Sequence, residues 1–533
     1  MAYPYPDGAP GEPSLRGVLE LVPDLMSHDP TEVAVKLRDR HGYVVRIPGL
    51  HPALDTGVYL VTHPEDVRRI LQTDPNDFGP LDVPGAHDFG KVVENSIVSL
   101  STEDGGGEWT QRTRMLSPEF TERAMHRHVP AMVEETLGSL AAFTNSYAEA
   151  GSASAGVRTG DGSVLLMPAM RRLSLRLLGV SLFGADVRAH ETQVIDAVDT
   201  LRAAFKRRQM NVVTGRITRH LPEDLHLPAF LGDRVGDPHI RLSGRTERHV
   251  YAALDALVAA ADDIARRRES TPRAFDDGLA TWLVRPDPLT GETLSPETLR
   301  QEILGLLIAG HATTSAALTW AFYLLASRPA MQERIHEEAR ATELLASLER
   351  VREAQATGGD ERFETRTDAE AGAAFLESLP YTRQVWAETL RLYPALPIFG
   401  RTTKREVELG GVTLPEGAHV LVSPFVTQRD PEFWPEPERF DPDRFQPERR
   451  DERHPFAYYP FSGGRHACLG RQVATTEALV TLAATLATHR VEFADSEMGP
   501  HPTPEAYAPT VGVDSAINLQ PDTDVAVRFV PRE

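Results

Sequence analysis

A single cysteine, Cys468, is the feature that most constrains how this chain of 533 residues can fold. It lies in the string Phe-Ser-Gly-Gly-Arg-His-Ala-Cys-Leu-Gly, residues 461–470, and an apolar-rich run over residues 473–487 follows. The glycines and the apolar run predict a tight loop that leads into a helix. Because the thiol has no second cysteine to pair with, its role must be packing, nucleophilic chemistry or metal ligation.

The charge around Cys468 favours metal ligation. At a helix N-terminus, free backbone N–H groups and the positive end of the helix dipole lower the pKa of a thiol and stabilise the thiolate, which is the form that binds metals. Arg465, His466 and Arg471 add positive charge within a few positions. The plainer alternative is a buried cysteine that acts as a small hydrophobic residue.

The loop resembles the haem-binding loop of the cytochrome P-450 (haem-thiolate monooxygenase) family, whose pattern Phe-x-x-Gly-x-(Arg/His)-x-Cys-x-Gly it matches at each defining position. The resemblance implies a haem b whose iron is bound by the Cys468 thiolate, with Phe461, His466 and Gly470 as cofactor-binding residues. It also implies a mainly α protein with a small β region, folded as one large cytochrome P-450-like domain.

A long apolar helix is predicted over residues 296–327. Ser295, Pro296 and Glu297 form a helix start, and Pro329 stops the pattern. Such a helix spans roughly 45 Å and could cross the centre of a large domain. Residues 304–326 are apolar enough to raise the question of a membrane span. The polar residues among them favour a buried core helix instead.

The middle of this predicted helix, Ala-Gly-His-Ala-Thr-Thr-Ser over residues 309–315, resembles the oxygen-binding motif of the family, Ala-Gly-x-(Asp/Glu)-Thr-Thr. The resemblance implies three catalytic residues. Gly310 would let a flat cofactor approach the backbone, and the Thr313 hydroxyl, with Thr314 beside it, would donate a hydrogen bond to dioxygen. The alternative is that both threonine hydroxyls bond back to carbonyls one turn earlier.

Ala312 departs from the family motif, because it stands where the family has an acid that is thought to help relay protons. Its presence leaves water, Thr313, Thr314 or His311 to deliver protons.

Glu388 and Arg391 stand three residues apart on a predicted helix over residues 381–393, so their side chains share one face. An exposed pair of this kind is worth well under ~1 kcal/mol. The string resembles the Glu-x-x-Arg helix of the family, and Pro-Asp-Arg-Phe around Arg444 resembles its Pro-Glu-Arg-Phe segment. The resemblance implies a buried structural triad of Glu388, Arg391 and Arg444. Residues 437–440 spell the second motif as well, but their spacing from the preceding Trp-Pro pair fits less well.

Three further residues are candidates for binding the haem propionates together with His466. Trp109 matches the family's Trp-x-x-x-Arg helix, but Thr113 occupies the expected basic position. Arg112, close to the same helical face, could substitute, and the alternative is an exposed basic helix. Arg401 lies where the family often places another propionate partner, on a strand after the Glu-x-x-Arg helix.

The domain organisation predicted from the sequence is simple. Residues 1–40 are expected to be an N-terminal leader that packs on the body, and residues 41–533 form the monooxygenase domain. Within it, residues 341–373 are expected to be a surface insertion. The net basic span 202–248 corresponds to the lid over the substrate entrance in the family, although a solvated basic face is the alternative. Residues 511–530 predict a terminal hairpin, whose tip often borders the substrate pocket.

Composition limits the partners. The net charge of −21 argues against nucleic acid. The first thirty residues lack the basic and apolar regions of a secretion signal, so we expect no membrane anchor and a cytoplasmic, bacterial protein.

Because no flavin or iron–sulfur domain is appended, electrons are expected from a separate ferredoxin and an NAD(P)H-dependent reductase. Arg112, Arg114, Arg465 and Arg471 suggest a basic surface for an acidic ferredoxin.

The function implied by the resemblance is insertion of one oxygen atom from O2 into an apolar small-molecule metabolite, by hydroxylation or epoxidation, within secondary metabolism. Because of Ala312, peroxide-driven oxidation and oxidative coupling or rearrangement on the same haem scaffold stay open. An alternative from another class is a non-enzymatic haem-binding sensor.

Overall fold

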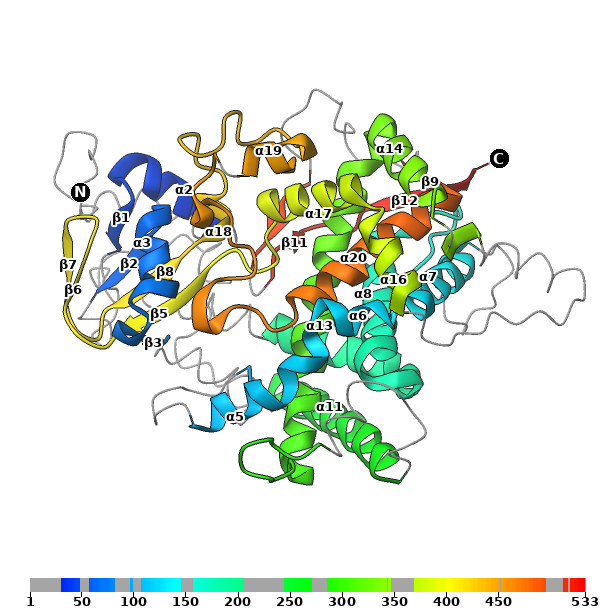
Figure 1. The fold of residues 1–533 in the computed structure, drawn as a ribbon, viewed down its shortest axis with the longest axis horizontal. Helices are drawn as coiled ribbons and strands as arrows, with labels where there is room; N and C mark the ends of the chain where they lie inside the picture. The colour runs from blue at the N-terminus through cyan, green and yellow to red at the C-terminus, as the bar shows by residue number, and fades with distance from the viewer. Residues whose placement is uncertain are drawn as a thin grey trace, which may run out of the picture.

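The computed structural model describes most of the chain, namely residues 30–47, 57–81, 96–98, 107–144, 157–204, 244–270, 285–342, 344–346, 369–450, 452–494, 511–515 and 518–532. Helices make up most of these residues, and the largest sheet lies to one side of them (Figure 1). The predicted fold class, mainly α with a small β region in a single domain, is confirmed.

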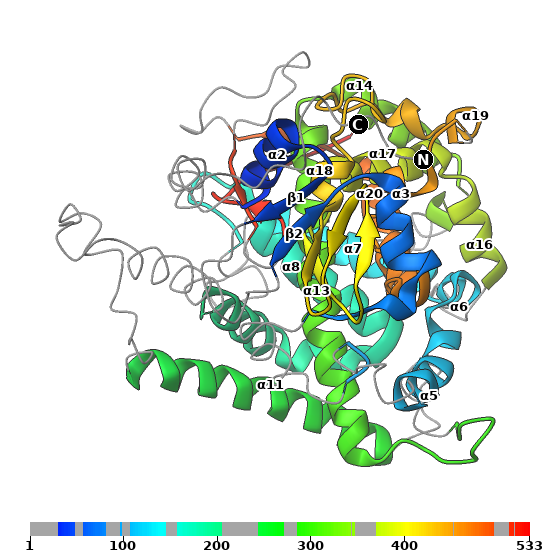
Figure 2. The same ribbon diagram turned by 90° about the vertical axis from the view of Figure 1, so that its left-hand side faces the viewer.

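The largest sheet has the strand order β1-β2-β8-β5-β3 and joins three strands from the N-terminal part of the chain to two strands within residues 399–422 (Figure 2). Its strands are β1 (Val44–Ile47), β2 (Val58–Val61), β3 (Phe78–Pro80), β5 (Phe399–Thr403) and β8 (His419–Val422). β1 and β2 form an antiparallel hairpin, and within this sheet only the β2–β8 pairing is parallel. This sheet places Arg401 on β5, opposite Val420 of β8.

The three smaller sheets are formed mainly by the C-terminal half of the chain. β6 (Val407–Leu409) and β7 (Val412–Leu414) form a hairpin whose turn residues Gly410 and Gly411 have φ of 53° and 80°. β4 (Val164–Leu165), β12 (Ala526–Pro531) and β9 (His489–Phe493) form a second sheet. β10 (Val513–Asp514) pairs with β11 (Gln520–Pro521). The single hairpin predicted over residues 511–530 is therefore wrong, because β12 pairs with β9 and β4 instead.

Helix α13 (Pro296–Ala326) is the central helix, and its bounds agree with the prediction. The Ser295 side chain caps it by accepting the backbone N–H of Thr298. The helix passes between α8 (Leu166–Leu178), α11 (Gly244–Ser270), α17 (Pro380–Leu392) and α20 (Arg471–Thr488) (Figure 1). By length and composition it could cross a membrane, but 78% of its most apolar window is buried in the fold.

The structure describes nine further α-helices, of which some pack on these five and others lie beside the largest sheet. They are α2 (Pro30–His41), α3 (Pro64–Arg68), α5 (Gly107–Leu116), α6 (Glu122–His126), α7 (Val129–Thr144), α14 (Pro329–Arg340), α16 (Ala369–Glu377), α18 (Pro424–Thr427) and α19 (Pro447–Arg450).

Two hydrophobic clusters divide α13 between them. The C-terminal half of the helix carries Trp320, whose ring stacks on Tyr393 with centroids 4.0 Å apart. The N-terminal half packs with α8 and α11 in a second cluster, against which the partly buried Ala312 and Leu469 lie. The residue that follows Cys468 and the residue that precedes Thr313 therefore border the same cluster.

Several predicted boundaries fall partly outside the described residues. Of the predicted leader, residues 30–40 lie in α2, whose Val33, Ala34 and Leu37 are buried in a small core cluster with strand residues of the sheet, while residues 1–29 lie outside the description. Of the predicted insertion, residues 343 and 347–368 lie outside it, and so do residues 205–243 of the predicted lid. These boundaries stay predictions.

Replacement of Gly372 in α16 should destabilise the protein, because an added Cβ would run into the backbone carbonyl of His126 on α6. We expect Gly372→Ala to lower the free energy of unfolding by about 1–3 kcal/mol. The matched control is Gly138→Ala on the exposed face of α7, where a Cβ meets no atom within 4 Å. That change should stabilise by up to about 1 kcal/mol. Urea denaturation checks both values, and a loss no larger in Gly372→Ala than in the control contradicts the packing.

Candidate active site

The loop that carries Cys468 is held in a strained backbone conformation. The backbone N–H of Cys468 donates to the carbonyl of Phe461 at 2.9 Å, which closes the loop. Within it Ser462 has a φ of 60° and Gly464 a φ of 65°, the left-handed region that side chains disfavour. A Cβ added at Gly464 would run into the carbonyl oxygen of Leu71. This glycine therefore lets the loop pack closely on residues 69–73.

Cys468 lies three residues ahead of α20, with Gly470 as the N-cap residue of that helix. The residue has exposed surface, yet surrounding protein atoms desolvate the sulfur. Burial raises the pKa of the thiol, against smaller lowering effects from the backbone N–H of Gly470 and the charge of Arg471. The expectation that the helix terminus dominates is thus wrong for the free thiol. A bound metal cation reverses the balance, because it deprotonates a coordinating thiol.

One turn of helix α13, the open turn at residues 309–313, contains partly exposed residues between two buried stretches. Residues 302–308 and 314–325 are buried, whereas Ala309, Gly310, Ala312 and Thr313 are partly exposed. The spacing of these four residues places them on one helical face. A flat cofactor or a small molecule could contact the helix only at such an opening.

The two threonine hydroxyls at this turn bond to the helix itself. Thr313 Oγ1 donates to the carbonyl of Ala309 at 2.9 Å, and Thr314 Oγ1 donates to the carbonyl of Gly310 at 3.0 Å. This is the alternative that the sequence left open. Gly310 also has a packing role, because an added Cβ would lie 2.9 Å from Leu178 Cδ2 of α8. The catalytic roles of all three residues stay predictions.

His311 is buried beside this turn. Its Nδ1 lies 2.8 Å from the carbonyl of Leu307, and because a carbonyl only accepts, Nδ1 carries the proton. Burial, with a smaller contribution from the charge of Arg171, lowers the pKa of His311 to about 4, against the raising effect of the hydrogen bond to Leu307. At neutral pH the ring is uncharged, with Nε2 left as a proton acceptor.

Positive charge gathers around His466, and the described residues place no acid among the charges that act on its ring. The His466 ring packs against Trp109, with centroids 5.0 Å apart, which brings two of the predicted propionate residues together. Burial and the charges of Arg401, Arg465 and Lys404 lower the pKa of His466. Arg401 is desolvated, and no acid pairs with it among the residues that the structure describes. The excess of cations fits the two carboxylates of a haem.

Arg112 has other partners. Its guanidinium pairs with Glu302 of α13 at 2.6 Å and with Glu108 at 2.7 Å, and only 6% of its side chain is exposed. Glu302 in turn accepts the backbone N–H of Ile97. This arrangement ties α5 to α13, and a propionate would compete with two carboxylates for Arg112. The propionate role of Arg112 stays a prediction. The pairing with Glu302 joins residues far apart in the chain, so no sequence pattern could reveal it. The nearby Thr113 Oγ1 is buried and has no hydrogen-bond partner among the described residues.

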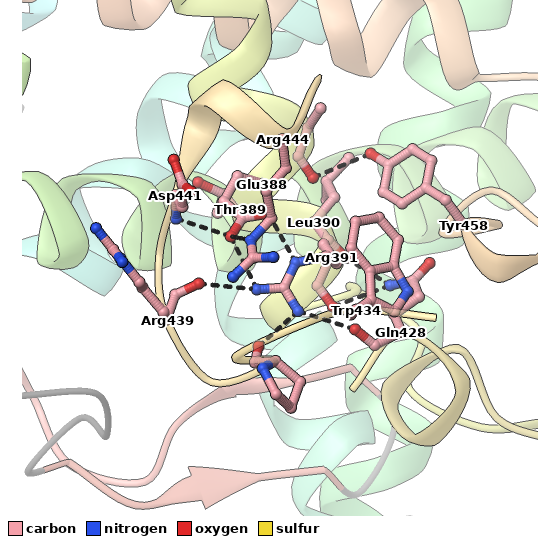
Figure 3. Close-up of polar contacts among 12 residues, drawn as sticks. Glu388, Thr389, Leu390, Arg391, Gln428, Trp434, Arg439, Asp441, Arg444 and Tyr458 are labelled. Atoms are coloured by element: carbon pink, nitrogen blue, oxygen red, sulfur yellow. Dashed lines mark hydrogen bonds and ion pairs between the residues drawn. The ribbon is translucent and has the colours of Figure 1, made fainter. Parts of the chain in front are cut away.

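Glu388, Arg391 and Arg444 meet in the interior behind this site (Figure 3). Arg391 makes two parallel hydrogen bonds to the carboxylate of Glu388, from Nε at 2.7 Å and from Nη2 at 2.8 Å. Arg444 Nε lies 3.5 Å from Glu388 Oε1. The same oxygen accepts the backbone N–H of Asp441 at 2.9 Å. Burial raises the pKa of Glu388, and the charges of the two guanidinium groups offset only part of that rise.

The remaining donors of Arg391 hold the chain segment that follows α18 (Figure 3). They bond the backbone carbonyls of Gln428 at 2.9 Å, Pro437 at 2.6 Å and Arg439 at 3.0 Å. Gln428, which sequence reasoning missed, donates from its side chain to the carbonyls of Leu390 and Arg391. Because most of these acceptors are backbone atoms, no pattern of side chains could reveal them.

The donor set fits a haem better than a metal held by side chains alone. Within the described ranges, no three His, Cys, Asp or Glu side chains converge on one point. One accessible cysteine, a cluster of cations and an apolar turn opposite are the parts that a macrocycle with its own nitrogen ligands requires.

Comparisons with known proteins agree with this geometry. A sequence profile of the family described as Cytochrome P450 matches residues 10–511. Cyclooctatin synthase of Streptomyces melanosporofaciens is 29% identical over 467 residues, which cover 86% of this chain and 85% of that protein. Cyclooctat-9-en-7-ol 5-monooxygenase of the same organism is 28% identical over 425 residues, covering 80% and 78%. The crystal structure of the cytochrome P450DA haem domain has the same fold, with a TM-score of 0.69 at 21% identity over 98% of this chain and 97% of that chain.

Replacement of Arg391 should destabilise the protein strongly. Arg391→Lys removes the two parallel bonds to Glu388 and leaves a buried carboxylate poorly paired, so we expect a loss of about 3–5 kcal/mol in the free energy of unfolding. The matched control is Arg439→Lys, whose pair with Glu436 has side chains 52% and 59% exposed. It should cost less than about 1 kcal/mol. Denaturant unfolding measures both, and similar losses in the two variants contradict the bracing role.

Proposed function

Because this chain belongs to the cytochrome P450 family, we propose that it is a haem-thiolate monooxygenase that inserts one oxygen atom from O2 into an apolar small molecule, by hydroxylation or epoxidation. The observation that carries the proposal is the position of Cys468. Cys468 lies just before α20 and beside cations for which the described residues offer no acid. Leu469, which follows it, borders the same cluster as the open turn of α13.

The haem would be held by residues from three parts of the chain. Cys468 would ligate the iron, while Phe461 and Gly470 would shape the loop around the ligand. Trp109, His466 and Arg401 would bind the propionates, since their charge or hydrogen-bond donors lack a carboxylate partner among the described residues. When bound, the haem supplies the reductive activation of dioxygen.

The residues of α13 would then orient the reaction and handle protons. Thr313 Oγ1 donates its own proton to Ala309, which leaves its oxygen lone pairs free to accept a hydrogen bond from a proton-carrying water. Neutral His311 offers Nε2 as a second proton acceptor close by. Ala312, Leu469 and the adjoining apolar cluster exclude bulk water from the turn.

The substrate is proposed to be an apolar, largely hydrocarbon metabolite of bacterial secondary metabolism. One similar enzyme is named for oxidation of cyclooctat-9-en-7-ol at position 5, and both similar enzymes come from a Streptomyces. The exposed apolar atoms of Ala309 and Ala312 suit a substrate without charge.

Electrons are proposed to come from NAD(P)H through a separate reductase and ferredoxin. Two of the four arginines proposed for the basic docking surface have their charge compensated. Arg112 pairs with two glutamates, and Arg114 pairs with Asp287 at 2.5 Å. Arg465 and Arg471 are the cations of that set for which the described residues offer no acid.

The thiolate assignment predicts a spectral change. In the reduced, CO-bound protein, Cys468→Ser should abolish the strongly red-shifted Soret band, because a serine oxygen does not donate electron density to iron as a thiolate does. The comparison is with the unchanged protein at equal haem content, with circular dichroism as the check on folding. A red-shifted band that persists in the folded variant contradicts the assignment.

Two alternatives make different predictions about turnover. Ala312, in place of an acid, keeps peroxide-driven oxidation or oxidative coupling possible. We expect product with the reduced partner system. Efficient product formation only with peroxide, and none with the reduced partner system, would contradict the proposal. A haem-binding sensor predicts a saturated iron and no spin-state change when an apolar ligand binds, whereas a monooxygenase predicts such a change.

A further inference from the structure

The open turn of α13 has a hydrogen-bond pattern that sets it apart from a regular helix. Its four successive backbone carbonyls, 309–312, each accept a side-chain hydrogen bond. The donors are Thr313, Thr314, Ser174 and Ser315 in that order, at 2.9, 3.0, 3.2 and 3.1 Å, and Asn518 Nδ2 also donates to Ala312 at 3.0 Å.

Side-chain donors of this kind compete with the N–H groups of the helix for its carbonyls, and they bend or loosen the turn they bond. The three donors on α13 itself move with the helix. The other two come from outside, Ser174 from α8 and Asn518 from the connection between β10 and β11. The geometry of the turn therefore depends on where these two neighbours hold their donors.

The carbonyl oxygen of the Asn518 side chain is held by the positively charged Arg202. It is 3% exposed, and its Oδ1 accepts from Nε of Arg202 at 3.3 Å. Arg202 in turn pairs with Asp514 on β10 at 2.6 Å. The carbonyl end of the amide therefore faces a cation, which leaves the NH2 end facing the Ala312 carbonyl. This orientation is the one that satisfies both contacts.

The contacts extend beyond one residue. The side-chain amide of Gln520 lies beside the guanidinium groups of both Arg171 and Arg202. Arg171 is also close enough to His311 for its charge to act on that ring. Helical segment 191–204, strand β11 and the open turn of α13 are thus joined by one buried polar network.

The place of this network in the site gives it a function. Ala312 brings no polar side chain to the turn, and the carbonyl of the same residue receives the amide of Asn518 from another part of the chain. We infer that Asn518 is a positioning residue for the oxygen-binding turn. Arg202 and Asp514 keep its amide directed at the Ala312 carbonyl, and the resulting bond sets the opening at Thr313. The inference rests on the proposed monooxygenase function.

The variant that separates the two ends of the amide is Asn518→Asp. A carboxylate keeps the contact with Arg202 but cannot donate to the Ala312 carbonyl. Asn76→Asp, at an exposed position remote in sequence, is the matched control for the added negative charge. Asn518→Ala, which removes both ends without adding charge, serves if the aspartate variant does not fold.

The first measurement is amide hydrogen exchange over residues 309–316 in the full-length, haem-loaded protein. Loss of one buried hydrogen bond should speed exchange there about five- to tenfold in Asn518→Asp. The control should exchange at the native rate. Native exchange over this segment in the folded variant would overturn the inference.

The second measurement uses O2 itself as the probe. Reduced protein, freed of reductant, is mixed with oxygenated buffer, and the rate of return to the ferric state is followed, a step in which iron loses one electron and O2 gains it as superoxide. A loosened turn admits water, so we expect oxidation several times faster in Asn518→Asp than in the control. Faster exchange with unchanged oxidation would overturn the positioning role. The reduced CO spectrum tests the thiolate separately, so a failure of the proposed function is distinguishable.

Discussion

The bonds of Arg391 are the interaction on which the rest of the site depends. The guanidinium neutralises the buried Glu388 carboxylate and binds three backbone carbonyls of the segment 428–439. Gln428 in this segment also accepts, at Oε1, the backbone N–H of Tyr459, which lies two residues before the cysteine loop. A charge pair that would contribute little on a surface thus fixes a long irregular stretch of chain, because every donor is desolvated and satisfied.

The two sides of the site are built on different principles. Around Cys468, the position of the sulfur follows from backbone geometry, with residues in the left-handed region and a glycine that allows close packing on Leu71. Around Thr313, side chains from the helix and from remote segments bond the carbonyls of a continuous helix. The position of the ligand residue is thus set by backbone geometry, and the helical turn is held by side chains from several segments.

Arg401 and Arg112, two candidates of the same kind in the sequence, differ in their charge partners in the structure. Arg401 and Arg112 were both candidates for the propionates. Arg401 is desolvated without an acid partner among the described residues, so an anion would stabilise it. Arg112 already pairs with Glu302 and Glu108, and a propionate would have to compete with two carboxylates for it. Arg112 on α5 finds an acid partner only because α5 packs against α13, which carries Glu302 and is distant in sequence.

The sequence by itself determined the family, the mainly α fold, the bounds of α13 and the spacing that brings Glu388 to Arg391, because each depends on local periodicity or on a short contiguous motif. The tertiary structure alone decided the partners of Arg112, the packing of Gly310 on Leu178 and the direction in which burial shifts the thiol pKa of Cys468. It also brought Asn518 to the carbonyl of Ala312, 206 positions away. Contacts of this kind join side chains to backbone atoms of remote segments, and no pattern in the sequence records which remote carbonyl a folded chain will present.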